Sequence, residues 1–227
     1  MSKRMRELFE DARRNGRKLF IPYVTAGYPT MKDTVPILLA AEAGGADIIE
    51  IGVPFTDPMA DGATIQHANQ IALEHGISVQ GCFDIVREAR EKGLKAPIVL
   101  MGYYNPLYSR GEARAVAEAK AAGADGFIVV DLPAEESGNF LAACRANDMS
   151  LIPLVAPTST NERIELLATL ADGSLLMEGN PGNGAEGNFR RVLRLGTDDQ
   201  LQTLHRDPRG EADLDEVVLD PRTQLPV

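Results

Sequence analysis

The sequence has few of the residues that mark a disulfide framework, a metal cluster or a membrane protein. Its 227 residues include no tryptophan and two cysteines, Cys82 and Cys144, which lie far apart and outside any CxxC spacing. This pattern argues against a disulfide scaffold or a zinc site and favours buried, reduced thiols of a cytosolic protein. No run of about 18 apolar residues occurs, so we expect no transmembrane helix and no membrane partner. The basic N-terminus lacks an apolar segment, so we expect a cytoplasmic location without a secretory signal.

Positive charge is also scarce. The formal net charge is −10 at pH 7 and the pI is about 4.8. A nucleic-acid partner normally needs a basic surface, so this balance argues against nucleic acid. The content of 44% hydrophobic and 25% charged residues is instead typical of a soluble domain with a sizeable core.

Short apolar or β-branched runs recur along the first 156 residues, each followed by helical spacing. The runs span 19–25, 47–52, 97–101, 126–131 and 150–156. None alternates cleanly between polar and apolar residues, which is typical of strands buried on both faces. Strands that alternate with helices predict right-handed βαβ units and a parallel sheet. We therefore predict an α/β fold of the (β/α)8 TIM-barrel class, which needs about 250 residues when complete.

Two joints between helix and strand are alike. EAGGADIIEIG and KAAGADGFIVVD each end a helix on glycine and place an aspartate, Asp47 or Asp125, just before a strand. The repeat supports βα units of similar build.

The composition changes from about residue 173. The last 55 residues contain no lysine and no isoleucine, and beyond 174–177 no segment predicts a buried strand. A formal GxGxxG at 182–187 has no βαβ unit of its own, so dinucleotide binding is not favoured. We predict an incomplete β/α-barrel domain over 1–172, with about five βα units, and an irregular or disordered tail over 173–227.

A carboxylate interrupts the second run, in the segment EIGVPFTDPMADG. Glu50 precedes the strand end at Gly52 by two residues, and Asp61 follows on the next loop. At the carboxyl end of a parallel strand Glu50 would face the pocket mouth, where partial burial suits it to acid/base work. Asp61 can reach the same pocket. In the structural alternative Glu50 is a satisfied buried ion and Asp61 an N-terminal helix cap.

The same segment resembles the signature of the tryptophan synthase α subunit. FIPYVTAGYP, APIVLMGYYNPLY, GFIVVDLPAEE and LIPLVAPTST resemble successive segments of that family, over about residues 5–172. The resemblance implies a lyase of tryptophan biosynthesis that cleaves indole-3-glycerol phosphate to indole and glyceraldehyde 3-phosphate by a retro-aldol reaction. It implies no metal and no cofactor, since pyridoxal phosphate would belong to a β subunit or fused β domain, the implied partner.

The resemblance also implies roles for individual residues. Glu50 would protonate C3 of the indole and assist deprotonation of the glycerol hydroxyl, while Asp61 would bind the indole N–H. Pro54 and Asp57 would lie on the loop that faces the β subunit. The substrate-binding walls would be Phe20, Tyr23, Leu100, Tyr103, Phe127 and Val129.

The tail lacks the glycine-rich segments with which this family holds the substrate phosphate. We therefore expect the reaction to be slow in this chain. The alternative is a truncated or frame-shifted, catalytically impaired form that acts at most as a β-subunit-binding module. Cleavage of indole-3-glycerol phosphate distinguishes these two hypotheses.

Overall fold

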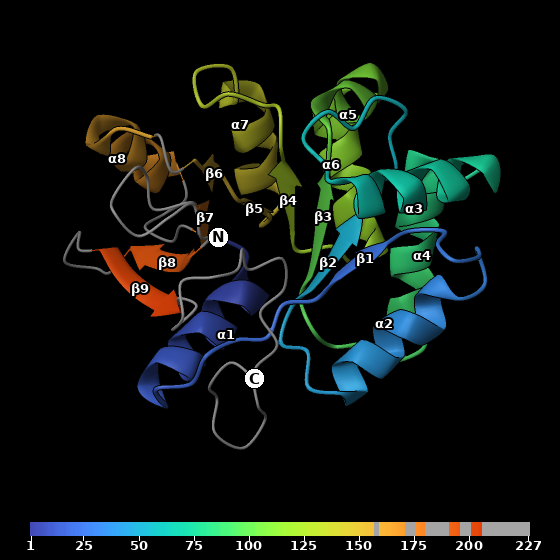
Figure 1. Ribbon diagram of the computed structural model, residues 1–227, viewed down its shortest axis with the longest axis horizontal. Coiled ribbons are helices and arrows are strands. Elements are labelled where there is room, and N and C mark those ends of the chain that lie inside the picture. Colours follow the sequence, from blue (N-terminus) through green and yellow to red (C-terminus); the bar gives the residue numbers. More distant parts are fainter. Residues whose placement is uncertain (157–158, 171–175, 180–190, 196–200, 206–227) are drawn as a thin grey trace. The chain divides into compact units, whose positions relative to one another are not determined.

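The computed structural model describes residues 1–156, 159–170, 176–179, 191–195 and 201–205 (Figure 1). The chain divides into two units, Met1–Leu151 and Ile152–Val227.

The first unit contains a sheet of parallel strands. They are β1 (Tyr23–Thr25), β2 (Ile49–Gly52), β3 (Ile98–Gly102), β4 (Gly126–Val129) and β5 (Ser150–Leu151). Their order in the sheet follows their order in the sequence. A doubly wound sheet reverses its order at the switch point, whereas a β/α barrel does not. The parallel α/β prediction is therefore confirmed, and a doubly wound topology is excluded for this unit.

Helices alternate with these strands. They are α1 (Lys3–Arg14), α2 (Thr34–Ala43), α3 (Ala63–Glu74), α4 (Val79–Glu91), α5 (Tyr104–Arg110), α6 (Glu112–Ala122) and α7 (Gly138–Ala146). Helix α4 packs between α2 and α6, and α6 packs on α7 (Figure 1). The core lies between these helices and one face of the sheet. Among the helices that the structure describes, none is long and apolar enough to cross a membrane.

Both cysteines lie in this core. Cys82 on α4 and Cys144 on α7 are buried and free, as expected. Burial raises the pKa of each thiol to about 12, so both stay protonated at neutral pH.

The two similar joints between helix and strand make the same hydrogen bonds to the neighbouring strand. The Asp47 carboxylate accepts a hydrogen bond from Phe20 N at 2.9 Å, and the Asp125 carboxylate accepts one from Ile98 N at 2.9 Å. The backbone N–H of each aspartate donates in return to the carbonyl of the same residue. Each aspartate thus fixes the start of its strand to the preceding strand. This is the amino-terminal edge, which serves stability in barrels of this kind.

Asp125 is also the buried centre of an ion cluster. Its side chain is 4% exposed and lies 2.9 Å from Arg90 and 2.8 Å from Arg4. Arg90 donates further hydrogen bonds to the carbonyls of Leu94, Ala96 and Gly123. The cluster therefore joins α1, α4 and the start of β4.

We expect Asp125→Ala to lower the free energy of unfolding by about 3 kcal/mol, because the change leaves the Arg90 guanidinium buried without its carboxylate. Urea denaturation measures the difference. The control is Asp84→Ala, which breaks the exposed Asp84–Arg87 pair on α4 and should cost at most about 1 kcal/mol. Equal losses in the two variants would contradict a structural role for the cluster.

The second unit begins where the fifth predicted run breaks in two. Pro153 has no N–H for the ladder, so the run divides into β5 and β6 (Leu154–Val155), which belong to different sheets. Strand β6 pairs in parallel with β7 (Leu176–Gly179), and α8 (Asn161–Leu170) connects them.

Strands β8 (Arg191–Leu195) and β9 (Leu201–His205) continue this sheet in antiparallel pairing. Both strands lie beyond 174–177, where the sequence analysis identified no segment typical of a buried strand. Antiparallel strands mix polar and apolar residues, so a search for continuous apolar runs misses them. The GxGxxG at 182–187 lies outside the described residues, and the boundary at 172 stays a prediction.

Candidate active site

Glu50 lies on the sheet face that points away from the helices. Its neighbours Ile49 and Ile51 are fully buried in the core. Because side chains alternate along a strand, Glu50 and Gly52 belong to the opposite face. The parallel register places Glu50 between Tyr23 of β1 and Val99 of β3. Glu50 is partly buried there.

The phenol of Tyr23 crosses the end of β2. A Cβ atom built on Gly52 would lie 1.9 Å from Tyr23 Oη and 2.5 Å from its Cζ. No side chain fits at position 52 while the ring keeps this place. Gly52 therefore admits an aromatic ring beside Glu50.

Asp61 lies on the loop between β2 and α3. Gly62 is the N-cap of α3, and the helix has no side-chain cap hydrogen bond, so the capping alternative for Asp61 is wrong. Its carboxylate instead accepts a hydrogen bond from Asn69 Nδ2 at 3.1 Å. Burial raises the pKa of Asp61, although hydrogen bonds from Asn69 and Tyr103 oppose the rise. The carboxylate is thus more basic than an exposed aspartate.

Both carboxylates act electrostatically on Tyr23. The pKa of this phenol is raised to about 12, first by burial and then by the negative charges of Asp61 and Glu50. Thus the fold brings Glu50 and Asp61, eleven residues apart in sequence, to the same tyrosine. Two carboxylates in different surroundings can take different proton-transfer roles.

The other predicted wall residues divide into two groups. Tyr103 is 7% exposed and reaches the Asp61 loop, where its Oη accepts a hydrogen bond from Ala60 N at 2.8 Å. Leu100, Phe127 and Val129 lie in the helix-covered core instead. Phe127, for example, meets Phe140 of α7 edge-on, with ring centroids 5.2 Å apart.

The structure therefore does not bring Leu100, Phe127 and Val129 to the carboxylates. The register places Leu100 and Phe127 beside Ile51, one residue out of phase with Glu50. The residues on the Glu50 face are Val99, Met101 and Ile128. Neighbouring residues of a strand point to opposite faces, so a prediction that is one residue out of phase selects the wrong face. The prediction of Leu100, Phe127 and Val129 as pocket walls is corrected accordingly.

Phe20 is not at the site either. Its backbone pairs with Asp47 at the amino-terminal edge of the sheet, three residues before Tyr23. At 3.3 Å per residue this separates Phe20 from Tyr23 by about 10 Å along the strand. Of the predicted walls, Tyr23 lies beside Glu50 on the neighbouring strand and Tyr103 lies against the loop that carries Asp61.

Asn69 was missed by the sequence analysis. It is 3% exposed, and its Oδ1 has no hydrogen-bond partner among the described residues. Its position eight residues after Asp61 carries no signal beyond helical spacing.

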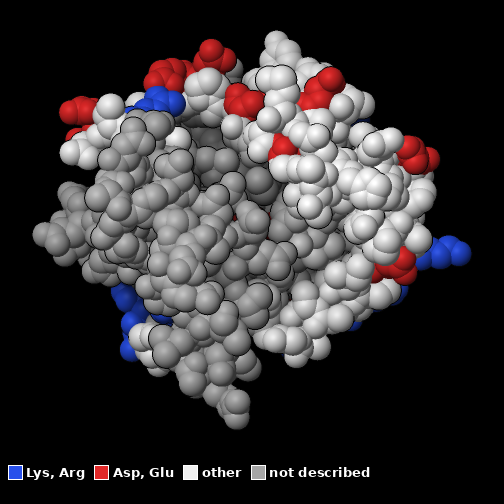
Figure 2. Space-filling view, viewed as in Figure 1, with Lys and Arg blue, Asp and Glu red and all other residues white. Residues whose placement is uncertain are grey.

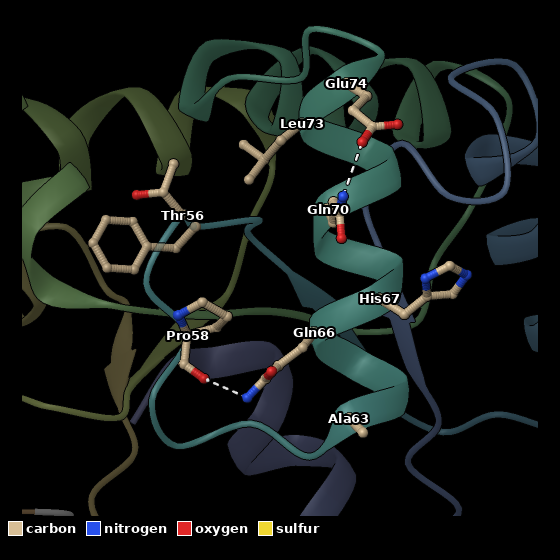
Figure 3. Close-up of a pocket in the computed structure, with 9 residues that line it drawn as sticks. Thr56, Pro58, Ala63, Gln66, His67, Gln70, Leu73 and Glu74 are labelled. Atoms are coloured by element: carbon tan, nitrogen blue, oxygen red, sulfur yellow. Dashed lines mark hydrogen bonds between the residues drawn. The ribbon is translucent and has the colours of Figure 1, made fainter.

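A separate open groove runs beside α3 (Figure 3). It has a volume of about 690 Å³ and lies between the β2–α3 loop and the helix, where Leu73 points toward Thr56 and Pro58. Gln66 Nε2 donates to the carbonyl of Pro58 at 3.4 Å across its lower end. Neither Glu50 nor Asp61 lines this groove. His67 lines it and is exposed, in agreement with a helix-surface residue.

The described part of the face in Figure 2 shows acidic side chains along its upper edge, whereas basic side chains are scattered. A nucleic-acid surface would gather basic residues into a patch. This distribution agrees with the net charge of −10.

The strand order and the acidic and tyrosine side chains near the strand ends define a protein of the (β/α)8-barrel class. A family model of the tryptophan synthase alpha chain matches residues 9–192, and the chain belongs to this family. The match extends twenty residues beyond the 172 of the sequence analysis.

Comparisons with individual relatives support the same family. The chain is 50% identical to the tryptophan synthase of Saccharomyces cerevisiae over 172 residues, 76% of this chain and 24% of that protein. It is 48% identical to the tryptophan synthase alpha chain of Roseiflexus sp. over 170 residues, 75% of this chain and 65% of the relative. The tryptophan synthase α2β2 complex of Pyrococcus furiosus matches with a TM-score of 0.68 and 40% identity, over 71% of this chain and 66% of that one. The chain therefore spans less than two thirds of the length of these relatives.

Proposed function

We propose that this chain is a lyase that cleaves indole-3-glycerol phosphate to indole and glyceraldehyde 3-phosphate in tryptophan biosynthesis. The observation that carries the proposal is the position of Glu50 beside Tyr23 on neighbouring strands, with Asp61 acting on the same phenol, in a chain of this family. The carboxylates supply two proton-handling groups, and the tyrosines supply aromatic surface beside them.

The reaction needs two proton transfers and one charge stabilisation. Glu50 donates a proton to C3 of the indole ring, which weakens the bond between C3 and the glycerol chain. The resulting Glu50 carboxylate takes the proton of the glycerol hydroxyl as that bond breaks, and it ends protonated again. The Asp61 carboxylate accepts a hydrogen bond from the indole N–H. It thereby stabilises the positive charge that protonation places on the ring. No metal or cofactor takes part in this scheme.

The proposed partner is a tryptophan synthase β subunit or a fused β domain, which would hold pyridoxal phosphate. The β2–α3 loop supports this assignment, because Asp57 is exposed on it and Met59 is 90% exposed. Pro54 is buried and would shape the loop rather than touch the partner. The proposed location is the cytoplasm.

The test is product analysis with the purified 227-residue chain and indole-3-glycerol phosphate. We expect indole and glyceraldehyde 3-phosphate in equal amounts, at a rate at least about 100-fold below that of a relative with the glycine-rich phosphate loops, since lost positioning alone can cost this much. Indole formation no faster than in a protein-free control would contradict the proposed function.

A further inference from the structure

The hydroxyl of Tyr103 acts on two consecutive residues of the β2–α3 loop, Ala60 and Asp61. Its Oη accepts a hydrogen bond from the backbone N–H of Ala60 at 2.8 Å. The same hydroxyl also acts on the Asp61 carboxylate, whose pKa it lowers. The phenol therefore holds the backbone immediately before Asp61 and lies near the Asp61 side chain.

The ring of Tyr103 holds the other end of the same loop. It stacks on Phe55 with ring centroids 5.1 Å apart and an interplanar angle of 30°. Phe55 lies near the start of the loop and Ala60 near its end, so one side chain that follows β3 contacts both parts. Tyr103 is only 7% exposed, which limits its movement.

The end of β3 is itself anchored. The backbone N–H of Tyr104 donates to Asp131 Oδ1 at 2.7 Å, so the turn that carries Tyr103 is tied to the residues after β4. The Asp61 loop is thereby connected through Tyr103 to the segments that follow β3 and β4. Loops without such a support lose the precision that catalytic groups need.

We propose that Tyr103 is a positioning residue of the lyase site, acting through Asp61, and that its role is not that of an aromatic wall. The inference rests on the proposed function. The phenol O–H keeps the Asp61 carboxylate turned toward the indole N–H, and its oxygen holds the Ala60 amide. The proton of Tyr103 stays on its oxygen throughout.

Tyr103→Phe separates the two roles, because it keeps the ring and removes the hydroxyl. We expect kcat for indole release to fall roughly 10-fold, since the hydroxyl that holds the Ala60 amide and acts on the charged Asp61 carboxylate is lost. The acid limb of the pH–rate profile should move to higher pH, because Tyr103 opposes the rise in the pKa of Asp61. The other groups that face Asp61, Asn69 of α3 and Tyr23 of β1, are unchanged in this variant. A wall role predicts that Tyr103→Phe is silent.

Amide exchange supplies a readout that needs no activity. In the isotope-labelled 227-residue chain, the Ala60 amide should exchange roughly 5-fold faster or more after Tyr103→Phe, because its acceptor is gone. Tyr108→Phe is the matched control, since Tyr108 is 62% exposed on α5, and it should change neither the exchange nor the rate.

Unchanged Ala60 exchange in Tyr103→Phe would overturn the inference, as would an unchanged kcat and pH profile in a chain that releases indole. If the unaltered chain releases no indole, the proposed function fails, and the Ala60 exchange still decides whether Tyr103 holds the loop.

Discussion

Asp61→Asn is expected to lower kcat/KM for indole-3-glycerol phosphate cleavage by roughly 100- to 1000-fold. Asparagine has the same shape and still accepts a hydrogen bond from Asn69 Nδ2, but it carries no negative charge to face the protonated indole. Initial rates of indole release measure the effect. The control is Asp57→Asn on the same loop, because Asp57 is exposed and accepts a hydrogen bond from the Thr56 hydroxyl. A loss in Asp57→Asn equal to that in Asp61→Asn would contradict the role of Asp61.

The same variant should be at least as stable as the unaltered chain at pH 7. Burial raises the pKa of Asp61 in the folded chain above the ordinary value of 3.8. Below that value the carboxyl is protonated in both states and contributes no difference. As the pH rises through the folded-state pKa, the native chain must ionise a partly buried group and loses stability, which the asparagine avoids. Urea denaturation of Asp61→Asn and of the unaltered chain at pH 4 and pH 7 would therefore show whether a loss of activity comes from the missing carboxylate or from a less stable fold.

The sequence alone predicts the strands of the first unit well. Strands buried on both faces need continuous apolar residues, so runs such as 97–101 and 126–131 stand out from the helices around them. The repeated glycine-to-aspartate joint also has a local physical cause, because Asp47 and Asp125 bond the strand beside them.

The inner face of the sheet was harder to predict. Val99 and Leu100 are adjacent and both apolar, and nothing in a continuous apolar run shows which of them points inward. Only the register, which sets Glu50 beside Val99, reveals that Leu100 and Phe127 face the helices. Side chains alternate between the two faces of a strand, so an error of one residue in the register assigns a side chain to the wrong face.

Contacts between segments far apart in the chain could not be predicted from the sequence either. Ala60 and Tyr103 are 43 residues apart, and their hydrogen bond depends on where two loops end in space. The sequence analysis did not identify the antiparallel strands β8 and β9, because their pairing rather than their composition makes them strands.

Glu50→Gln is expected to lower kcat by at least roughly 100-fold and as much as about 10,000-fold, with little change in KM. Glutamine matches the size of glutamate but can neither donate a proton to C3 nor accept one from the glycerol hydroxyl. Since Glu50 performs both transfers in the proposed scheme, both steps fail together. The control is Glu74→Gln on α3, an exposed carboxylate that accepts a hydrogen bond from Gln70 and lies outside the site.

The initial rate of indole release by the unaltered chain, measured beside Glu50→Gln at equal and high protein concentration, tests the central claim most directly. Circular dichroism should show the same fold in both proteins. The account predicts indole release by the unaltered chain and by Glu74→Gln, and a rate for Glu50→Gln reduced at least about 100-fold or to the protein-free background. Equal rates for the unaltered chain and Glu50→Gln would show that the carboxylate on β2 is not the acid and base of this reaction.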